Sequence, residues 1–524
     1  MTNQTCLRTS SSPRTLPALA ALLAFLAAPV LYAADAPSRF KVQKLSVEGD
    51  VLDVLAADLD GDGKKDLVIP FVSGAAPAQK RGLAIFWNGP QGLAARPDLI
   101  VSADDDRACA FDLASIDGQP GDALLFATEH GVVARSLRGR ALGPKVMLTE
   151  GPTLFVEPDQ GELSRMTLVQ PLGGGVQALL VPRLDGLLVL VNKAGVFTRS
   201  ALLPVQMEAS YSRRRRITLG RGPGAHLAPI NARFVFPAVH LADFDGDGLL
   251  DLFLAQEDRI TVFKQAAGGV FKEQPDYARD FAIRTPEERK EMSSPAAVMI
   301  RDIDGDGRAD LVVRKQVSQG LASATTTSLV FFGQPGGGYG KMADQVLRHE
   351  GASGVEVQLA DVTADGRPDL VVPSVNIGVF AIIRILTSKT LKMNFQVFAF
   401  DPKTRKFDSK PSAERELRFK ISTNGQADSQ AVDLFGDYDG DGRPDLVYGT
   451  DDEELSIFRG QPGGALFEED PVEKIEGRAF GDVLPVDLTG AGRDDLVLHY
   501  PSTKGHRGEV VVLLNQGGWP GAKK

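Results

Sequence analysis

The segment Asp243-Phe-Asp-Gly-Asp-Gly-Leu-Leu-Asp251 recurs in the same register at 58–66, 302–310 and 437–445. Each copy carries carboxylates at positions 1, 3, 5 and 9 and glycines at positions 4 and 6, and an apolar run such as Leu67-Val68-Ile69 follows at once. Close carboxylates repel one another by about 1 kcal/mol per pair even in water. We therefore expect a cation to neutralise each copy.

The ligand pattern favours calcium. Ca²⁺ takes oxygen ligands from alternate residues of a loop in which Gly permits a sharp turn, whereas Mg²⁺ requires fewer protein oxygens and stricter octahedral geometry. The loop differs from an EF-hand because its last ligand stands at position 9 rather than 12, and a strand-forming run follows in place of a helix. The alternative is a solvated acidic turn without an ion, since Asp-Gly pairs also form turns.

The predicted ligands are the four carboxylates of each full copy and the backbone carbonyl at position 7, whose side chain varies. A fifth loop, in which Thr replaces the second carboxylate, is predicted to bind more weakly, so we expect four or five calcium ions. The residues are Asp58, Asp60, Asp62, Lys64 and Asp66; Asp243, Asp245, Asp247, Leu249 and Asp251; Asp302, Asp304, Asp306, Arg308 and Asp310; Asp437, Asp439, Asp441, Arg443 and Asp445; and Asp361, Thr363, Asp365 and Asp369.

Composition indicates an all-β protein. The 524 residues include 55 Gly and 32 Pro but only 7% aromatic residues, which favours many short strands and turns over helices. The net charge is −10, which argues against a general nucleic-acid binder.

The N-terminus resembles a secretory signal. Arg8 and Arg14 precede an Ala/Leu-rich run from Leu16 to Leu31, and small residues follow at 33–36. Residues 1–36 are thus predicted to be a signal peptide, with an uncleaved membrane anchor as the alternative. Cleavage would leave Cys109 as the single cysteine, so no intramolecular disulfide could form. The protein is expected in the periplasm or outside the cell.

The acidic loop marks an internal repeat. Its last position falls every 50 to 76 residues, the length of one four-stranded unit, at Asp66, Asp122, Gln177, Asp251, Asp310, Asp369, Asp445 and Asp495. A Gly-rich turn that follows an apolar strand gives the same count, at 87–92, 137–139, 191–195, 263–269, 332–338, 458–464 and 514–518, with the polar turn 400–407 in the sixth unit. Each unit is therefore predicted to contain strand A, the acidic loop, strands B and C, the Gly turn and strand D. Units 2 and 3 have lost most of the ligand residues, and unit 8 has lost some of them.

The two ends of the chain are predicted to pair. The last unit stops after Glu509–Leu514 without a strand D, and Arg39–Val47 precedes the first strand A as an isolated strand. Pairing these segments would close a ring and leave no open edge.

These motifs resemble the FG-GAP/VCBS family, whose fold is the calcium-bearing β-propeller also found at the head of integrin α chains. The resemblance extends over residues 39–518 and implies an eight-bladed propeller over residues 37–518, with seven blades as the alternative and 519–524 as a tail. The family that the chain resembles also includes propellers that act as polysaccharide lyases.

Strand order predicts which rim binds partners. The acidic loops and Gly turns share one rim, whereas the long B–C segments at 71–82, 314–328 and 373–389 and the long D–A connections at 205–236 and 273–294 belong to the other. Because loops carry function more readily than strands, the predicted partner surface is the rim away from calcium.

Two insertions are chemically distinctive. Arg213–Arg216 could bind an acidic polysaccharide or lipid head groups, or could be a solvated loop paired with nearby acids. The apolar run Ile377–Leu386 could cap the funnel, dock on a partner in an envelope assembly, or pack on its own blade.

Catalytic motifs are absent from the sequence. None of the six His has a zinc-type spacing, His240 is expected to be a packed strand residue, and no G-x-S-x-G motif occurs. The sequence therefore favours a binding or scaffolding module for a protein or glycan over an enzyme. A carbohydrate-active enzyme such as a lyase, with its site in the funnel, is the alternative.

Overall fold

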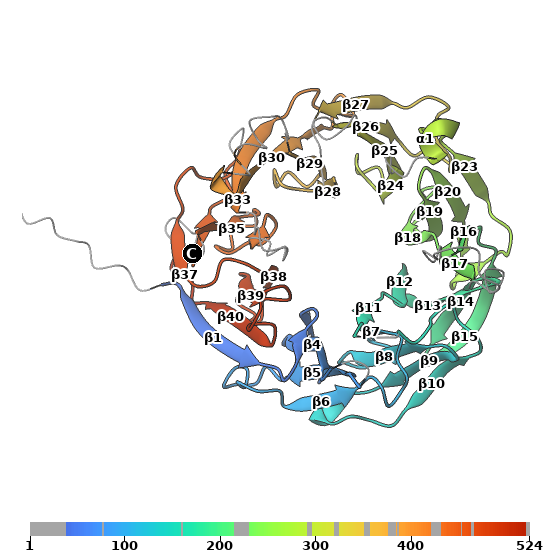
Figure 1. The fold of residues 1–524 in the computed structure, drawn as a ribbon. Helices are drawn as coiled ribbons and strands as arrows, with labels where there is room; N and C mark the ends of the chain where they lie inside the picture. The colour runs from blue at the N-terminus through green and yellow to red at the C-terminus, as the bar shows by residue number, and fades with distance from the viewer. Residues whose placement is uncertain are drawn as a thin grey trace, which may run out of the picture. The chain divides into compact units, whose positions relative to one another are not determined.

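The chain folds as an all-β, eight-bladed propeller closed into a ring (Figure 1). The computed structural model describes residues 38–519 apart from 76–77, 159–160, 214–229, 291–295, 319–323, 351–356, 376–383, 385–386, 421–430, 452 and 463–465. The predicted signal peptide, Arg214–Arg216 and nearly all of 377–386 lie outside the described residues.

In each of the first four blades, the strands follow one another from the centre of the ring outward, and consecutive strands are antiparallel. Their strands are β2 (Asp50–Val51) and β3 (Leu55–Ala57), both on β4 (Asp66–Ser73), then β5 (Lys80–Phe86) and β6 (Leu99–Ser102); β7 (Ala110–Ala114), β8 (Ala123–Thr128), β9 (Gly131–Arg135) and β10 (Val146–Glu150), with β11 (Ser164–Arg165) parallel to β7; β12 (Val169–Gly173), β13 (Val176–Arg183), β14 (Gly186–Lys193) and β15 (Val196–Leu203); β18 (Ala238–Ala242), β19 (Asp251–Gln256), β20 (Arg259–Phe263) and β23 (Tyr277–Asp280).

The last four blades repeat the same order. Their strands are β24 (Ala296–Arg301), β25 (Asp310–Ser318), β26 (Ala324–Phe331) and β27 (Gln345–Glu350); β28 (Gln358–Ala360), β29 (Asp369–Val375), β30 (Thr390–Phe398) and β33 (Ala413–Lys420); β34 (Val432–Asp433), β35 (Leu446–Asp451), β36 (Glu454–Phe458) and β37 (Glu473–Glu476); β38 (Asp482–Val486), β39 (Asp495–His499), β40 (Glu509–Asn515) and β1 (Phe40–Ser46).

Ring closure by the N-terminal strand is confirmed. Strand β1 pairs antiparallel with β40 from Phe40 opposite Asn515 to Ser46 opposite Glu509. The first strand thereby becomes the outer strand of the last blade, and the count is eight blades rather than seven. The pairing covers the edge of β40 that would otherwise be open.

The hydrophobic core is divided among the blades. Among the described residues, eight clusters of buried apolar side chains each join two neighbouring blades. The second strands β4 and β8 are buried along almost their whole length because a blade covers each of their faces, whereas outer strands such as β37 alternate buried and exposed residues. Blade-to-blade packing explains why strands B read as continuous apolar runs.

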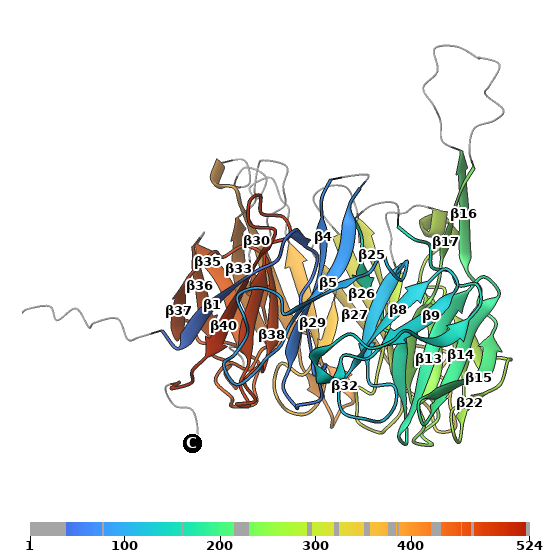
Figure 2. The ribbon, with the colours of Figure 1, turned by 90° about the horizontal axis from the view of Figure 1, so that it is seen from below.

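The two rims differ as the strand order predicts (Figure 2). Short hairpins lie on the rim that carries the acidic loops, here called the loop rim: the Gly turn of unit 4 joins β21 (Gln265–Ala266) to β22 (Val270–Phe271), and the polar turn of unit 6 joins β31 (Phe400–Asp401) to β32 (Lys406–Phe407). The opposite rim carries a two-stranded arm of β16 (Glu208–Arg213) and β17 (Ile230–Val235) that projects from the ring.

The long B–C segments are partly strand rather than loop. In blade 1, β4 and β5 extend to Ser73 and Lys80, so the connection shrinks to residues 74–79. In blade 5, Ser318 of β25 pairs with Ala324 of β26. A short helix, α1 (Pro286–Lys290), lies in the connection between blades 4 and 5. Within the described part of the chain, no helix is long and apolar enough to cross a membrane.

Candidate metal centres

Each acidic loop is shaped by its own sequence. The two carboxylate oxygens of Asp243 accept hydrogen bonds from the amides of Gly246 and Gly248, both at 2.7 Å. These glycines have φ values of 83° and 84°, a left-handed conformation that glycine adopts without a Cβ penalty. The equivalent bonds form in the other full copies from the position-1 residues Asp58, Asp302 and Asp437.

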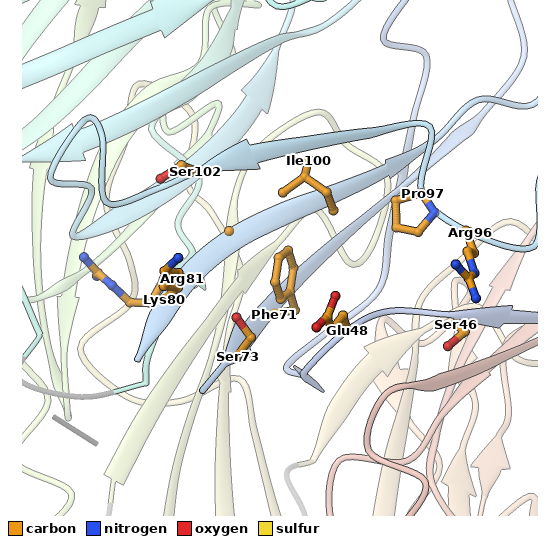
Figure 3. Close-up of a pocket in the computed structure, with 11 residues that line it drawn as sticks. Ser46, Glu48, Phe71, Ser73, Lys80, Arg81, Arg96, Pro97, Ile100 and Ser102 are labelled. Carbon is orange, nitrogen blue, oxygen red and sulfur yellow. The ribbon is translucent and has the colours of Figure 1, made fainter. Parts of the chain in front are cut away.

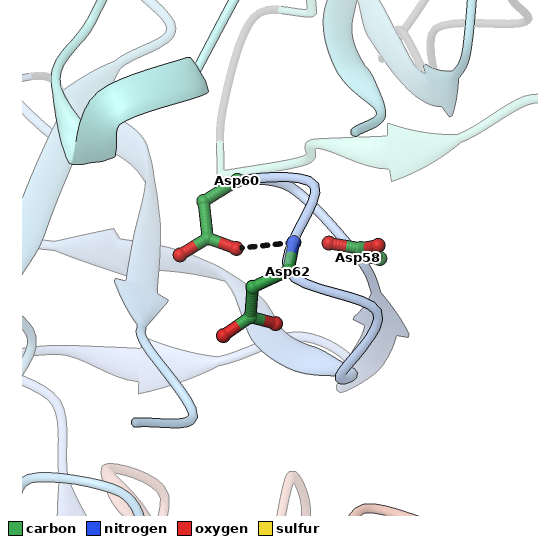
Figure 4. A group of neighbouring side chains, drawn as sticks. All are labelled: Asp58, Asp60 and Asp62. Atoms are coloured by element: carbon green, nitrogen blue, oxygen red, sulfur yellow. Dashed lines mark hydrogen bonds between the residues drawn. The ribbon is translucent and has the colours of Figure 1, made fainter. Parts of the chain in front are cut away.

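The loops bring carboxylates together. Among the described residues, four groups of three acidic side chains offer ligand atoms within 4.8 Å of one another, namely Asp58, Asp60 and Asp62; Asp243, Asp245 and Asp251; Asp302, Asp304 and Asp306; and Asp437, Asp439 and Asp445. Figure 4 shows the first group gathered at the turn, with the Asp62 amide donating to Asp60 at 3.1 Å. Each of the four full copies predicted from sequence therefore supplies one acidic group that could hold a cation.

The donor set fits a hard divalent cation. Oδ1 of Asp245 is buried and has no hydrogen-bond partner, while Oδ2 of the same carboxylate pairs with Lys264. A buried carboxylate oxygen without a partner is costly unless a cation contacts it. Oxygen-only ligands at alternate loop positions are the donors that Ca²⁺ prefers.

The aspartate at position 9 joins two turns of its blade. Asp251 is fully buried; its Oδ2 accepts a hydrogen bond from the Phe244 amide at 2.8 Å, and its Oδ1 accepts one from the Gln265 amide at 2.7 Å. The same pair of bonds recurs at Asp66, Asp310, Asp445 and Asp495. Each carboxylate therefore fixes the A–B loop against the Gly turn.

Blade 8 separates this structural role from metal binding. Its loop has Thr489 and Ala491 where the full copies have carboxylates, yet Asp495 keeps both backbone bonds. A carboxylate has about four lone-pair sites, so position 9 can make these bonds and still contact an ion. Its assignment as a ligand stays a prediction.

Burial makes the position-9 carboxylates hard to ionise. Burial, reinforced by the nearby loop carboxylates, raises the pKa of Asp66 and Asp251 to about 6 and that of Asp310 and Asp445 to about 7. A bound cation would stabilise the ionised forms.

A basic side chain contacts the position-3 carboxylate of every full copy. Arg140 Nε donates to Asp60 at 2.7 Å, and Arg459 Nε lies 2.6 Å from an oxygen of Asp439. The corresponding pairs in blades 4 and 5 are Lys264 with Asp245 and Arg405 with Asp304. Arg140 and Arg405 come from the next blade along the chain, so these ion pairs also hold neighbouring blades together.

Sequence reasoning missed an amide that links successive blades. Asn515 Nδ2 donates to the carbonyl of Tyr438 in the preceding blade at 2.6 Å and to the carbonyl of Asp494 in its own blade at 3.0 Å. Asn88 and Gln265 make the same two kinds of bond, and Asn192 donates to Ile116. The available signal was an Asn or Gln recurring between strand C and the Gly turn.

The loops that have lost carboxylates still make some of the hydrogen bonds seen in the full copies. In the weaker fifth loop, Asp361 accepts a hydrogen bond from the position-6 amide of Gly366 at 2.8 Å, as in the full copies, and a second one from the position-5 amide of Asp365 at 3.0 Å. In unit 2, the Asp122 amide donates to the carbonyl of Asp58 at 2.6 Å. These loops retain the turn and its contacts with neighbouring blades.

The histidines His240, His349 and His499 lie in different blades. His240 is a half-buried residue of β18, as predicted, and burial lowers its pKa. His349 packs on Phe398 with ring centroids 4.4 Å apart, and His499 is buried in β39. Burial raises the pKa of the Cys109 thiol, which disfavours the nucleophilic thiolate. The lyase alternative stays a prediction.

Comparisons with known proteins identify the repeats. The FG-GAP-like repeat family matches residues 243–313, 302–372 and 437–518. No curated protein matches the chain.

Two solved structures illustrate the similarity in fold. A lectin of Agrocybe aegerita specific for non-reducing terminal N-acetylglucosamine is 16% identical over 91% of this chain and 95% of that chain, with a TM-score of 0.35. The V. cholerae biofilm matrix protein Bap1 is 12% identical over 93% of this chain and 92% of that chain, with a TM-score of 0.31. TM-scores of this size transfer no ligand or partner to the present chain.

Proposed function

Because this chain carries FG-GAP-like repeats and folds as a closed propeller, we propose that it is an exported, calcium-stabilised binding module. The acidic loops stabilise the A–B turns of the blades, and the opposite rim binds a glycan or protein ligand. The observation that carries the proposal is the projecting arm β16–β17, with a cavity beside it, on the rim opposite the acidic loops.

The loop rim is occupied by structural contacts. Position-9 aspartates, interblade amides and position-3 ion pairs all join elements of that rim to one another. The arm β16–β17 projects from the opposite rim (Figure 2). At its base lies a mostly apolar cavity of about 930 Å³, lined among others by Phe155, Leu184 and Phe236 from the D–A and B–C connections.

In this proposal, bound calcium stabilises the folded protein after export. A mature chain with Cys109 alone has no intramolecular disulfide to stabilise it outside the cell. A ligand that binds only the folded state stabilises that state by mass action, and calcium is abundant outside cells. The loops would thus serve as the stabilising device of an exported protein.

The proposal is tested by glycan-array and pull-down binding of the purified chain, with calcium and with EDTA. The Leu184→Glu/Phe234→Glu double variant alters the cavity at the base of the arm, whereas Val270→Glu/Met342→Glu is a matched pair of exposed apolar residues on the loop rim. We expect the first pair to weaken binding and the second to leave it unchanged. Absence of any ligand, or loss of binding only in the loop-rim pair, would contradict the proposal.

A further inference from the structure

A second cavity, of about 740 Å³, lies at the seam where the last blade meets the first. One wall is the face of blade 1, and the other is formed by Ser46 and Glu48, at the end of β1, together with Arg96 and Pro97 (Figure 3). The amide of Ser46 donates to the carbonyl of Ala95 at 3.0 Å, which fixes the second wall. The volume lies within the range of about 300–1,000 Å³ that is typical of small-ligand sites.

Strand register places the blade-1 residues on one sheet face. Ser73 lies opposite Lys80, and Phe71 lies opposite Gly82. Gly82 in turn lies opposite Ser102. Residues directly opposite in an antiparallel pair share a face, so the aromatic ring, the ammonium group and the hydroxyls all line the cavity.

The floor of the seam cavity is apolar. Phe71 is 7% exposed, and the neighbouring Ile100 is 52% exposed. A Cβ at position 82 would lie 3.0 Å from the Phe71 ring and 3.0 Å from the Val101 carbonyl oxygen. Glycine therefore leaves room for the Phe71 ring to pack over it, and the part of the ring that reaches the cavity could contact the C–H groups of a sugar ring.

The charge of the seam cavity is positive in an acidic protein. Lys80 and Arg96 are exposed and form no ion pair with any described residue. They lie at opposite ends of the cavity with Phe71 between them (Figure 3). Arg81 is 6% exposed and already binds Asp104 at 2.9 Å, so it adds no free charge, and Glu48 is the one lining carboxylate.

From this arrangement we propose that the seam cavity binds a short segment of a polysaccharide whose sugar rings carry carboxylates. Lys80 and Arg96 bind carboxylates at the two ends, Phe71 and Ile100 contact a sugar ring, and Glu48 and the serines bind hydroxyls. The inference rests on the proposed binding function and names its ligand class. Because the ligand contacts both the segment after β1 and blade 1, it also stabilises the closed ring.

The test is calorimetric titration of the full chain with a galacturonate trisaccharide, its methyl ester and inorganic phosphate. We expect the trisaccharide to bind and to raise the melting temperature. The ester keeps the shape but lacks the charge and should bind at least about tenfold more weakly, the effect of losing one charge-assisted hydrogen bond. Phosphate should not compete, since it has no sugar ring.

Substitutions of the two basic residues test whether the trisaccharide binds in the seam cavity. Lys80→Gln and Arg96→Gln should each weaken trisaccharide binding about tenfold. Lys410→Gln, an exposed lysine of blade 6, should leave it unchanged. Circular dichroism and the melting temperature of the free proteins show whether the variants remain folded.

The outcomes separate the two proposals. Failure to bind the trisaccharide, equal binding of the methyl ester, or binding insensitive to Lys80 and Arg96 overturns the seam site. If another ligand then binds and responds to Leu184→Glu/Phe234→Glu, the proposed function stands while the seam site falls. If no ligand binds in the array or the pull-down, both fail.

Discussion

The side-chain amide of Asn88 donates a 2.6 Å hydrogen bond to the carbonyl oxygen of Leu488, a residue 400 positions away. The same nitrogen donates to the carbonyl of Lys65 at 3.1 Å, so one side chain connects the acidic loops of the first and last blades. With the β1–β40 pairing, this contact closes the ring.

Asn88→Ala should lower the stability of the protein by about 1–3 kcal/mol, because two carbonyls of the loop rim lose a donor. Chemical denaturation followed by intrinsic fluorescence measures the change. Asn394→Ala removes a 3.3 Å contact with Glu414 on an exposed strand and should cost far less. Equal losses in the two variants would contradict the role of Asn88 in ring closure.

Deleting residues 38–47 should open the ring, because β40 loses its outer partner and exposes an unpaired edge. We expect a lower melting temperature and concentration-dependent association in size-exclusion chromatography. A synthetic peptide of residues 38–47 added in trans should restore the monomer. An unchanged elution profile and melting temperature would show that β1 is dispensable.

Removing calcium with EDTA should lower the melting temperature. A site saturated about 100-fold above its Kd stabilises the folded state by about 2.7 kcal/mol. Asp243→Asn should reduce the calcium-dependent shift, whereas Asp487→Asn in the depleted loop of blade 8 should not, although both aspartates accept two glycine amides. Elemental analysis that finds no bound metal, with no effect of EDTA, would rule out the metal centres.

Asp495→Asn should destabilise the protein by about 1–3 kcal/mol to the same extent with and without calcium, because the amide group leaves one of two buried backbone donors unpaired. Asp251→Asn should cost more in calcium than in EDTA if position 9 is also a ligand. Identical calcium dependence of the two variants would mean that position 9 is purely structural.

Acid should weaken the junction of blades 5 and 6 through His349. Burial lowers the pKa of His349 from 6.5 to about 4. The unfolded chain therefore takes up a proton first as the pH falls, and the stability due to neutral His349 is complete above about pH 6.5 and lost as the pH falls towards 4. Between pH 7.5 and 5 the loss is about 2 kcal/mol.

His349→Phe keeps an aromatic ring against Phe398 and removes the titrating group. Urea unfolding at pH 7.5 and pH 5 should show a smaller loss of stability on acidification in the variant than in the natural protein. An equal loss in both would assign the acid sensitivity to other groups.

Much of the fold follows from local patterns. The acidic loops, the Gly turns and the unpaired strand at each end predicted eight units and their closure, because each signal lies within one short segment. The contacts of Asn515 with Tyr438 and of Arg405 with Asp304 were not predictable, since they join different repeats whose spacing varies. The B–C segments of blades 1 and 5 were expected to be loops and instead prolong the strands, because cross-strand pairing continues beyond the apolar run.

The sequence by itself determined the repeat, the order of strands in each blade and the carboxylates of the four loops, because each marker, an acidic loop or a Gly turn, lies within one short segment. The tertiary structure decided what those groups contact. Closing the ring aligned Asn88 with Leu488, and it brought Ser46 and Glu48 against blade 1, where they form one wall of the seam cavity. These contacts arise only when blades pack, because β1 takes its place in the last blade by pairing with β40 from the other end of the chain.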